Sequence, residues 1–213
     1  MNGLQVGKQV GTILFSLGLA ALSLLAGLAG LRPGAPALRV PRGAAAGPAV
    51  VMPASGVWQL VRVGRVLDAD TYEGAAAGGL VRLRLAGVDA PELGQPFGRA
   101  AADSVRRLLG GRYAWVLPAG ADGYGRTLCR VRVRPGAFSA ARAVGLDSLL
   151  VARGWAWAYA PGGAGPALAG LEQAARDAGR GLWRCGPAGV VRPGIWRALT
   201  KQEKAAYQGV CDW

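Results

Sequence analysis

The chain concentrates its acidic residues in one short stretch. Five of its 12 Asp and Glu residues fall between positions 68 and 92, although the formal net charge is +13. They belong to two runs, Asp68-Ala69-Asp70-Thr71 and Arg84-Leu85-Ala86-Gly87-Val88-Asp89-Ala90-Pro91-Glu92, with Glu73 between them. Carboxylates this close repel one another unless positive charge lies among them. The spacing therefore predicts a divalent cation, flanking arginines, or both.

The composition excludes several kinds of catalysis. The chain has no histidine, so imidazole cannot serve as base, acid or metal ligand. Lysine occurs only at positions 8, 201 and 204, which leaves the central region without an amine nucleophile. The positive charge of that region is entirely arginine, whose planar donors match phosphate oxygens. General solubility could explain most of these arginines, but it does not explain Arg84 and Arg126.

The hydrophobic pattern predicts a mainly β domain that positions these residues. Strand-like alternation covers 57–67, 71–75, 80–85, 113–117 and 127–133, and amphipathic helices are expected near 99–109, 147–153 and 167–178. Gly110-Gly111 should end the first helix. Three strands, a helix, two strands and further helices predict an α+β, mainly β fold. We expect a five-stranded barrel of the OB type, capped by about three helices.

The N-terminal part differs from this domain. Residues 12–31 are about 20 largely apolar residues, enough for a membrane-spanning helix or for a cleaved secretory signal. Residues 32–56 are rich in Pro, Gly and Ala and resemble a tether. We therefore expect an anchor or signal at 1–31, a linker at 32–56, a folded domain at 57–197 and a tail at 198–213.

Four spaced motifs resemble the staphylococcal nuclease (thermonuclease) family. They are Asp68-x-Asp70-Thr71, Arg84-x4-Asp89-x-Pro91-Glu92, Asp122-Gly123-Tyr124-Gly125-Arg126 and Leu150-Val151-Ala152-Arg153-Gly154, in the family's order. Gly181-Leu182-Trp183 and Trp196-Arg197 also resemble the end of that domain. The resemblance implies an OB-fold barrel and a calcium-dependent phosphodiesterase that acts on DNA and RNA.

The residues agree with a Ca²⁺ site of that kind. Asp70 at the start of one strand and Asp89 at the end of another can converge on a hard cation. The resemblance adds the backbone carbonyl of Ala90 as a ligand, Asp68 as a water-mediated ligand and Thr71 as a neighbour of the site. An Asp-x-Asp-Thr run is more often a solvated turn, an interpretation that the partner motif at 89–92 disfavours.

The resemblance also assigns catalytic and binding roles. Glu92 corresponds to the catalytic glutamate, which orients or deprotonates the attacking water. Arg84 and Arg126 correspond to the two arginines that bind the scissile phosphate and stabilise charge on its oxygens. Tyr124 and Tyr159 are expected along the nucleotide groove. The tryptophans at 155 and 157 could stack on bases, but packing onto the barrel is the favoured interpretation, and Trp183 is expected in the core.

Three cysteines allow one disulfide. Cys129 should be a buried free thiol, because strand alternation places it on an inward face. Cys185 and Cys211 flank the tail, and in an oxidising compartment their pairing would tie the tail down. Free thiols in a cytosolic protein are the alternative.

Two functions remain open at this point. The first is a calcium-dependent nuclease, exported or membrane-anchored, that binds DNA or RNA and is monomeric. The second is a non-catalytic nucleic-acid-binding module tethered to a membrane. Glu92 favours the nuclease, because a carboxylate aimed at phosphate would weaken simple binding. The positive charges after the hydrophobic segment favour a cytoplasmic domain, but the danger of a nuclease to its own cell and the abundance of Ca²⁺ outside favour export.

Overall fold

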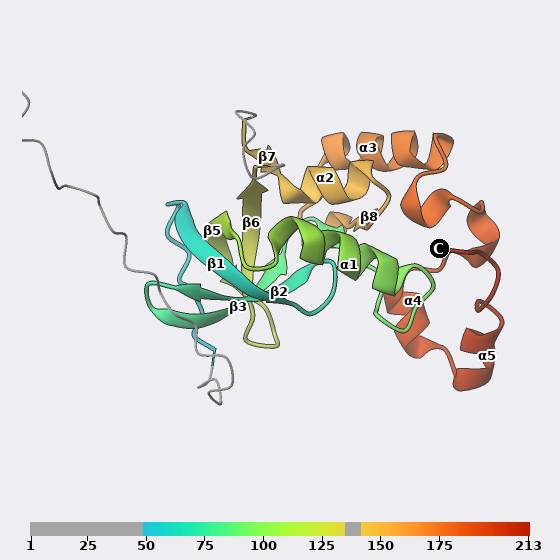
Figure 1. Cartoon of the computed structure of the whole chain (residues 1–213), viewed down its shortest axis with the longest axis horizontal. Coiled ribbons are helices and arrows are strands. Elements are labelled where there is room, and N and C mark those ends of the chain that lie inside the picture. The colour runs from blue at the N-terminus through green and yellow to red at the C-terminus, as the bar shows by residue number, and fades with distance from the viewer. Residues whose placement is uncertain (1–48, 135–141) are drawn as a thin grey trace, which may run out of the picture. The chain divides into compact units, whose positions relative to one another are not determined.

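One curved sheet forms the centre of the domain, and it closes into a barrel (Figure 1). The computed structural model describes residues 49–134 and 142–213, which fall within one compact unit. The sheet order is β3-β2-β1-β5-β6-β7, and β3 also pairs with β6 in parallel. The strands are β1 (Gln59–Val66), β2 (Thr71–Ala76), β3 (Gly79–Leu85), β5 (Tyr113–Ala121), β6 (Thr127–Val133) and β7 (Val144–Gly145). The pairing of β3 with β6 closes β1, β2, β3, β5 and β6 into a barrel, and β7 only extends the sheet beside β6, so the predicted five-stranded OB barrel is confirmed.

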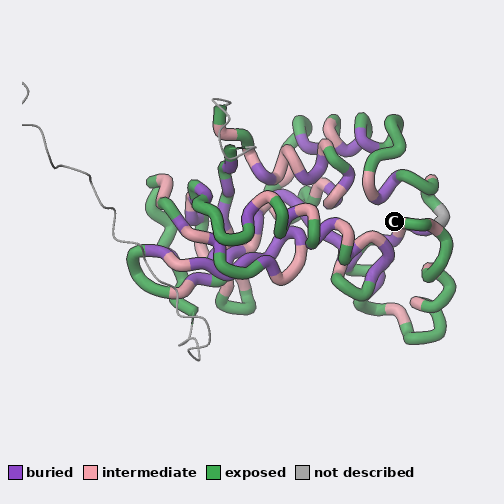
Figure 2. The backbone as a smooth tube through the Cα atoms, in the orientation of Figure 1, coloured by how far each residue is buried: buried purple, intermediate pink, exposed green. Residues whose placement is uncertain are grey.

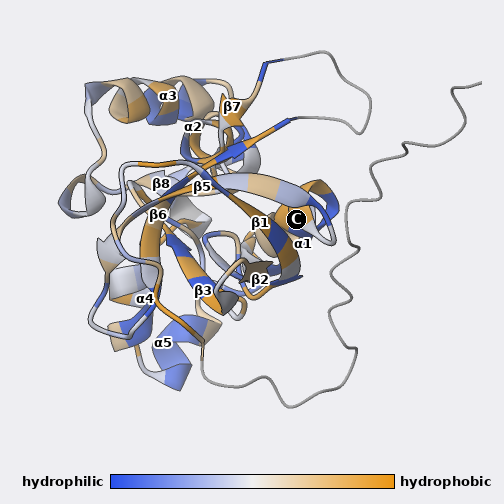
Figure 3. Cartoon of the chain, turned by 90° about the vertical axis from the view of Figure 1, so that its left-hand side faces the viewer, coloured by the Kyte–Doolittle hydropathy of each residue, from blue (hydrophilic) through white to orange (hydrophobic). Residues whose placement is uncertain are grey.

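Alternation of small apolar and polar residues builds the barrel wall. Val81, Leu83 and Leu85 of β3 point inward and are almost fully buried, whereas Arg82 lies on the outer side. Figure 3 shows this alternation of hydrophobic and hydrophilic residues along β3. The inward faces of β1, β2, β5 and β6 complete one hydrophobic core, with buried residues coloured purple in Figure 2.

Two irregularities bend the strands enough to close the sheet. The register of β1 with β2 shifts between Val63 and Arg65, and that of β5 with β6 shifts between Pro118 and Gly120. Bulges of this kind increase local twist and curvature. At Gly74 of β2, a Cβ atom would come within 2.7 Å of the carbonyl oxygen of Arg62, so only glycine fits where β1 and β2 approach this closely.

Three helices cover the barrel where the sequence predicts them. They are α1 (Gly98–Leu109), α2 (Leu146–Ala152) and α3 (Pro166–Asp177). Helix α1 buries Ala101, Ala102, Val105 and Leu109, and Gly110 follows its last residue. Helix α3 buries one side and exposes the other (Figure 2). The short helices α4 (Pro193–Ala198) and α5 (Lys201–Ala205) were not predicted, although Thr200 and Glu203 form a capping box before α5.

A small second sheet also escaped prediction. Strands β4 (Val88–Asp89) and β8 (Trp157–Ala158) pair with each other in antiparallel fashion. Two residues per strand leave no periodic pattern to recognise. This pair fixes Asp89 opposite Trp157, so it helps to position the acidic motif.

The tryptophan predictions are confirmed where they favoured packing. Trp157 and Trp183 are buried, and their rings meet edge to face with centroids 5.9 Å apart. Together with Ala175 and Leu182 they form a second hydrophobic cluster. Trp155 is partly buried and packs against the main core.

The hydrophobic segment at 12–31 lies outside the described residues. Within 49–134 and 142–213, no helix has both the length and the apolar character needed to cross a bilayer. Contacts with the barrel begin before Val57: the Val50 N–H donates to the Leu80 carbonyl at 2.8 Å, and the Met52 N–H donates to the Thr127 hydroxyl at 2.9 Å. These contacts fall within the predicted linker at 32–56.

The cysteines differ in their environments. Cys185 and Cys211 form a disulfide, with their Cα atoms 5.8 Å apart and a separation of 26 in sequence. Cys129 of β6 is free and completely buried, as strand alternation predicts. Burial raises the pKa of the Cys129 thiol to about 12.

Candidate active site

The residues with predicted chemical roles lie around one open cavity. Its volume is about 380 Å³, similar to that of ordinary ligand pockets. It is lined by Asp68, Asp70, Thr71, Arg82, Arg84, Asp89, Ala90, Glu92, Tyr124, Arg126 and Arg197. Every predicted catalytic and metal-binding residue is in this set. The site is assembled from the β1–β2 turn, the start of β2, β3, β4 with the segment after it, the β5–β6 turn and α4.

Asp70 connects β2 to the second acidic motif. Its carboxylate accepts the Ala90 N–H at 2.6 Å and the Thr71 hydroxyl at 3.1 Å. Its own backbone carbonyl accepts the Leu85 N–H at 2.9 Å, at the end of β3. Asp68 accepts the Asp70 N–H at 3.0 Å. Two segments about 20 positions apart in sequence are thereby joined at one carboxylate.

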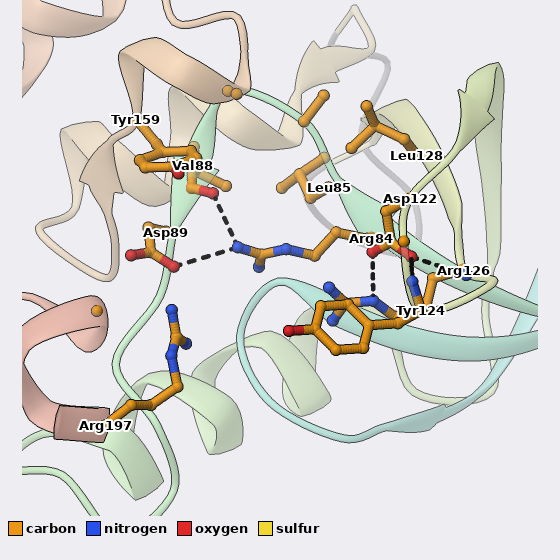
Figure 4. Close-up of a pocket in the computed structure, with 15 residues that line it drawn as sticks. Arg84, Leu85, Val88, Asp89, Asp122, Tyr124, Arg126, Leu128, Tyr159 and Arg197 are labelled. Carbon is orange, nitrogen blue, oxygen red and sulfur yellow. Dashed lines mark hydrogen bonds and ion pairs between the residues drawn. The ribbon is translucent and has the colours of Figure 1, made fainter.

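Arg84 lies between the two principal carboxylates. One guanidinium nitrogen forms an ion pair with Asp70, and Nη2 lies 3.2 Å from Oδ1 of Asp89 and 3.3 Å from the Val88 carbonyl. Figure 4 shows the Arg84 side chain extended toward Asp89 and Val88. The guanidinium is 16% exposed and therefore largely withdrawn from water. It presents a fixed positive charge at the cavity wall.

Burial disfavours the ionised form of two of the acidic groups. Burial raises the pKa of Asp68 and of Asp89, although nearby Arg84 lowers each in part. Burial likewise lowers the pKa of Arg84, which Asp89 counteracts. Desolvation disfavours the charged form of each group. An additional cation would stabilise the ionised carboxylates here.

The turn between β5 and β6 holds Arg126 in place. Asp122 accepts the backbone N–H groups of Tyr124 at 2.9 Å and of Arg126 at 3.0 Å, and its other oxygen lies 2.7 Å from Nε of Arg126. Although partial burial opposes it, these hydrogen bonds from Arg126 and Tyr124 lower the pKa of Asp122. Gly125 has φ +71°, a conformation that favours glycine. The Arg126 side chain thus projects into the cavity with its orientation set by the turn.

Glu92 faces a residue from the C-terminal end of the domain. Oε1 of Glu92 lies 2.5 Å from Nη1 of Arg197, which comes from α4. The Glu92 side chain is 37% exposed, so water can reach its carboxylate. Gln95 supports the Glu92 backbone, because its side-chain oxygen accepts the Glu92 N–H at 3.2 Å, and its amide donates to the Val191 carbonyl.

The two tyrosines occupy the rim of an adjoining cavity of about 300 Å³, similar to that of ordinary ligand pockets. This cavity shares Arg84, Asp89, Tyr124, Arg126 and Arg197 with the first, so the two are continuous. Tyr124 is 87% exposed, and Cζ of Arg126 lies 5.4 Å from its ring centroid. Tyr159 is 39% exposed and lies across the cavity from Tyr124 (Figure 4). The rim offers aromatic surface beside the arginines.

Comparison with known proteins agrees with this geometry. The family described as Staphylococcal nuclease homologue matches residues 82–185. A protein named Uncharacterized endonuclease from Escherichia coli O157:H7 is 38% identical over 136 residues, 64% of this chain and 83% of that protein. Protein ParB of Escherichia coli is 37% identical over 159 residues, 72% and 89% of the two chains. Micrococcal nuclease of Shigella flexneri is 33% identical over 143 residues, 64% and 79% of the two chains.

This chain belongs to the staphylococcal nuclease family. The family match contains Arg84, Asp89, Glu92 and Arg126 but ends before Arg197. Arg197 therefore joins the nuclease-type cavity from outside the matched region, through the segment that the disulfide closes.

The roles of three residues that lie in or support these cavities were not predicted from the sequence. Arg197 was recognised only as the end of the domain, and Asp122 only as part of a turn motif. Gln95 had no signal at all, because its hydrogen bonds reach Val191, 96 positions away. The Asp-Gly-x-Gly turn signature could have identified Asp122 as an orienting group for Arg126.

The fit of a metal ion can be judged from the donor atoms. Asp70 and Asp89 offer hard carboxylate oxygens, and both residues are buried beside the cavity. Such donors suit Ca²⁺ rather than a soft metal. Within the described parts of the chain, no group of three or more Asp, Glu or Cys side chains is clustered closely enough to hold a metal ion by itself. The structure places the Ala90 N–H, rather than its carbonyl, in contact with Asp70.

Proposed function

We propose that this protein is a nuclease that hydrolyses phosphodiester bonds of DNA or RNA. The observation that carries the proposal is that Glu92, Arg84 and Arg126 line one cavity together with Asp70 and Asp89. Negative charge repels a phosphodiester unless it is matched, and this cavity pairs every carboxylate with an arginine or a hydrogen-bond donor. The likeness to proteins named endonuclease and micrococcal nuclease supports the same conclusion.

The side chains divide the reaction among them. Glu92, which is open to water, accepts a proton as water oxygen attacks phosphorus. The bond from phosphorus to the leaving oxygen breaks, and that oxygen takes up a proton from solvent water. Charge spreads over the remaining phosphate oxygens during this displacement, and the guanidinium groups of Arg84 and Arg126 stabilise it. Because the two arginines are held by Asp89 and Asp122, little reorganisation is needed when the phosphate arrives.

We propose Ca²⁺ as the cofactor. Asp70 and Asp89 would hold it with the Ala90 carbonyl, Asp68 would contribute through water, and Thr71 would adjoin the site. The bound ion would stabilise negative charge on the phosphate. The chain's own contribution is to hold the two carboxylates close together, because Arg84 contacts each of them.

We also propose that the nuclease domain functions outside the cytoplasm, either secreted or anchored by residues 12–31. The Cys185–Cys211 disulfide supports this location, because such bonds persist mainly in oxidising compartments. A reporter fused after Pro53 should be active on the outer side of the membrane. A reporter active only in the cytosol would reverse the proposal, as would free thiols at both cysteines in protein isolated from its own compartment.

One experiment tests the enzymatic proposal directly. Residues 49–213 cover the described part of the fold, and the full chain serves as reference. Each is incubated with single- and double-stranded DNA and RNA, with Ca²⁺ and with chelator. We expect cleavage with Ca²⁺ and none with chelator. Binding without cleavage under every condition would instead favour a nucleic-acid-binding module, and cleavage that resists chelation would refute the metal assignment.

A further inference from the structure

A band of aromatic, leucine and arginine side chains lies on the outer face of the barrel, outside the cavity that Glu92 lines. Hydrogen-bonded pairing places Leu60 of β1, Trp115 of β5 and Arg132 of β6 in one row, and Leu117 and Arg130 in the next. Trp58, just before β1, lies under Arg132, with Cζ of the arginine 4.9 Å from the ring centroid. We call these six residues the outer track.

Four of the six residues of the outer track are exposed to solvent, and Trp58 and Leu117 are partly buried. Trp115 is 43% exposed and Leu60 is 46% exposed. Arg130 and Arg132 are exposed, whereas the alternate residues of β6 point inward and are buried. Large apolar side chains that lie exposed side by side commonly mark a binding surface.

The charged side chains that the three strands add to this face are all basic. Residues 57–66, 113–121 and 127–134 contain no Asp or Glu, so the three strands add no carboxylate to it. Asp147, at the start of α2, is the acidic residue that shares a cavity with Arg130 and Leu117. A surface of arginines interleaved with aromatic rings matches a partner that combines phosphates with flat bases.

The outer track is continuous with the proposed active site. In the parallel pairing of β3 with β6, Leu128 lies beside Arg84. From there Leu128, Arg130 and Arg132 follow one another on the outer face of β6, which spans about 13 Å at the usual rise per residue. The cavity of the two tyrosines shares Ala86, Gly87, Leu128 and Gly162 with the cavity that Leu117 and Arg130 line.

We propose that the outer track binds a single-stranded segment of the nucleic acid substrate and leads it toward the cleavage site. Arg130 and Arg132 contact phosphates, and the rings of Trp58 and Trp115 stack on bases. An unpaired strand fits better than a duplex, because only unpaired bases can turn their faces to these rings. The proposal concerns the substrate of the nuclease and so rests on the proposed function.

The test compares two variants that lose the same charge. The track variant is Arg130→Thr with Arg132→Thr, and the control is Arg180→Thr with Arg184→Thr, near the end of α3, where neither residue lines these cavities. A fluorescein-labelled 20-nucleotide oligothymidylate is titrated in chelator, so that no cleavage occurs. We expect about tenfold weaker binding for the track variant alone. For this variant, the slope of log affinity against log salt concentration should be smaller in magnitude by about 1.4, because each lost phosphate contact on a single strand reduces the slope by about 0.7.

Stacking is tested separately with Trp115→Ala and Trp115→Phe. The alanine variant should bind the oligonucleotide several-fold more weakly, and the phenylalanine variant should retain most of the affinity. With Ca²⁺, cleavage of the dinucleotide dTpdT should be unchanged in all these variants, because a dinucleotide is too short to reach Trp115. A rise in KM for the 20-mer without loss of dinucleotide cleavage supports the outer track.

Several results would overturn it. Equal weakening in the track variant and the control would show that only net charge matters. An equal loss on the dinucleotide would show that the substitutions disturb the fold. Loss of binding to phosphatidylserine vesicles with unchanged oligonucleotide binding would assign this face to a membrane. If the wild type cleaves nothing but the track variant still binds the oligonucleotide less, the proposed function fails and the outer track stands.

Discussion

Two regions of the same barrel use arginine side chains in different surroundings, one with carboxylate partners and the other with aromatic rings. In the active-site cavity, each arginine is held by acidic partners. Arg84 contacts Asp70 and Asp89, Arg126 contacts Asp122, and Arg197 contacts Glu92. On the outer track, Arg132 lies over the Trp58 ring instead, in strands without acidic residues. A paired arginine is fixed in direction, which suits charge stabilisation at one phosphorus atom. An arginine beside aromatic rings keeps its attraction for any phosphate that passes, which suits affinity without a fixed position.

The largest effect should come from Glu92, because it separates catalysis from binding. Glu92→Gln should lower kcat by about a thousandfold, since it removes the group that accepts the proton of the attacking water. Binding of the oligonucleotide in chelator should be unchanged or tighter, because a negative charge is lost. Steady-state rates with Ca²⁺ and titrations in chelator measure both quantities. Asp177→Asn on α3 is the control, and equal rates for the two variants would remove Glu92 from the mechanism.

Lysine substitutions test whether fixed orientation matters in the cavity. Arg84→Lys and Arg126→Lys should each lower kcat/KM by about a hundredfold although the charge is kept, because an ammonium group cannot contact two partners in a planar fork. Arg65→Lys is the matched control: it pairs with Glu73 and is 72% exposed. If the cavity variants behave like this control, charge alone is sufficient and the distinction between the two regions disappears.

The disulfide should act on the cavity through Arg197. Removing Cys185–Cys211 by a double change to Ala should lower the free energy of unfolding by about 3 kcal/mol, as expected for a closed loop of this length. Loss of the disulfide should also reduce kcat/KM about tenfold, because it frees the segment that holds the Arg197 guanidinium in the cavity. Arg197→Ala should have a similar effect, because it removes that guanidinium. Denaturant unfolding and cleavage rates test this. Combining the changes should give no further loss of activity, since both act on one contact. Additive losses would show that the disulfide acts elsewhere.

A smaller effect is expected from acid titration of Asp122. Folding lowers its pKa below the usual 3.8, so the stability it contributes is present above pH 3.8 and is lost as the pH falls through the folded-state value. Asp122→Ala should therefore be less stable than the wild type at pH 7, by about 1 kcal/mol. The difference should shrink below pH 3.8. Thermal unfolding at pH 3 and pH 7 decides this, and a difference that is the same at both would mean that Asp122 acts through packing alone.

Most of the fold and of the candidate site could be predicted from spaced motifs and from the alternation of apolar and polar residues. The inward Val81, Leu83 and Leu85 and the amphipathic pattern of α1 are local properties, so period alone predicts the barrel strands and the helix. The positions of Asp70, Asp89, Glu92, Arg84 and Arg126 could be named because their motifs recur in a known family in the same order. The burial of Cys129 could be predicted from strand alternation as well.

The sequence by itself therefore determined which residues carry charge near the site, which faces of the strands are apolar and which cysteines flank the tail. The tertiary structure decided which charges meet. Arg84 reaches Asp70 and Asp89 only because β3 lies beside β2 and ends at the second acidic motif. Arg197 meets Glu92 across 105 positions, and the outer track forms because β1, β5 and β6 are neighbours. Side-chain contacts over such separations depend on strand order and closure of the barrel, and neither leaves a periodic signal in the chain.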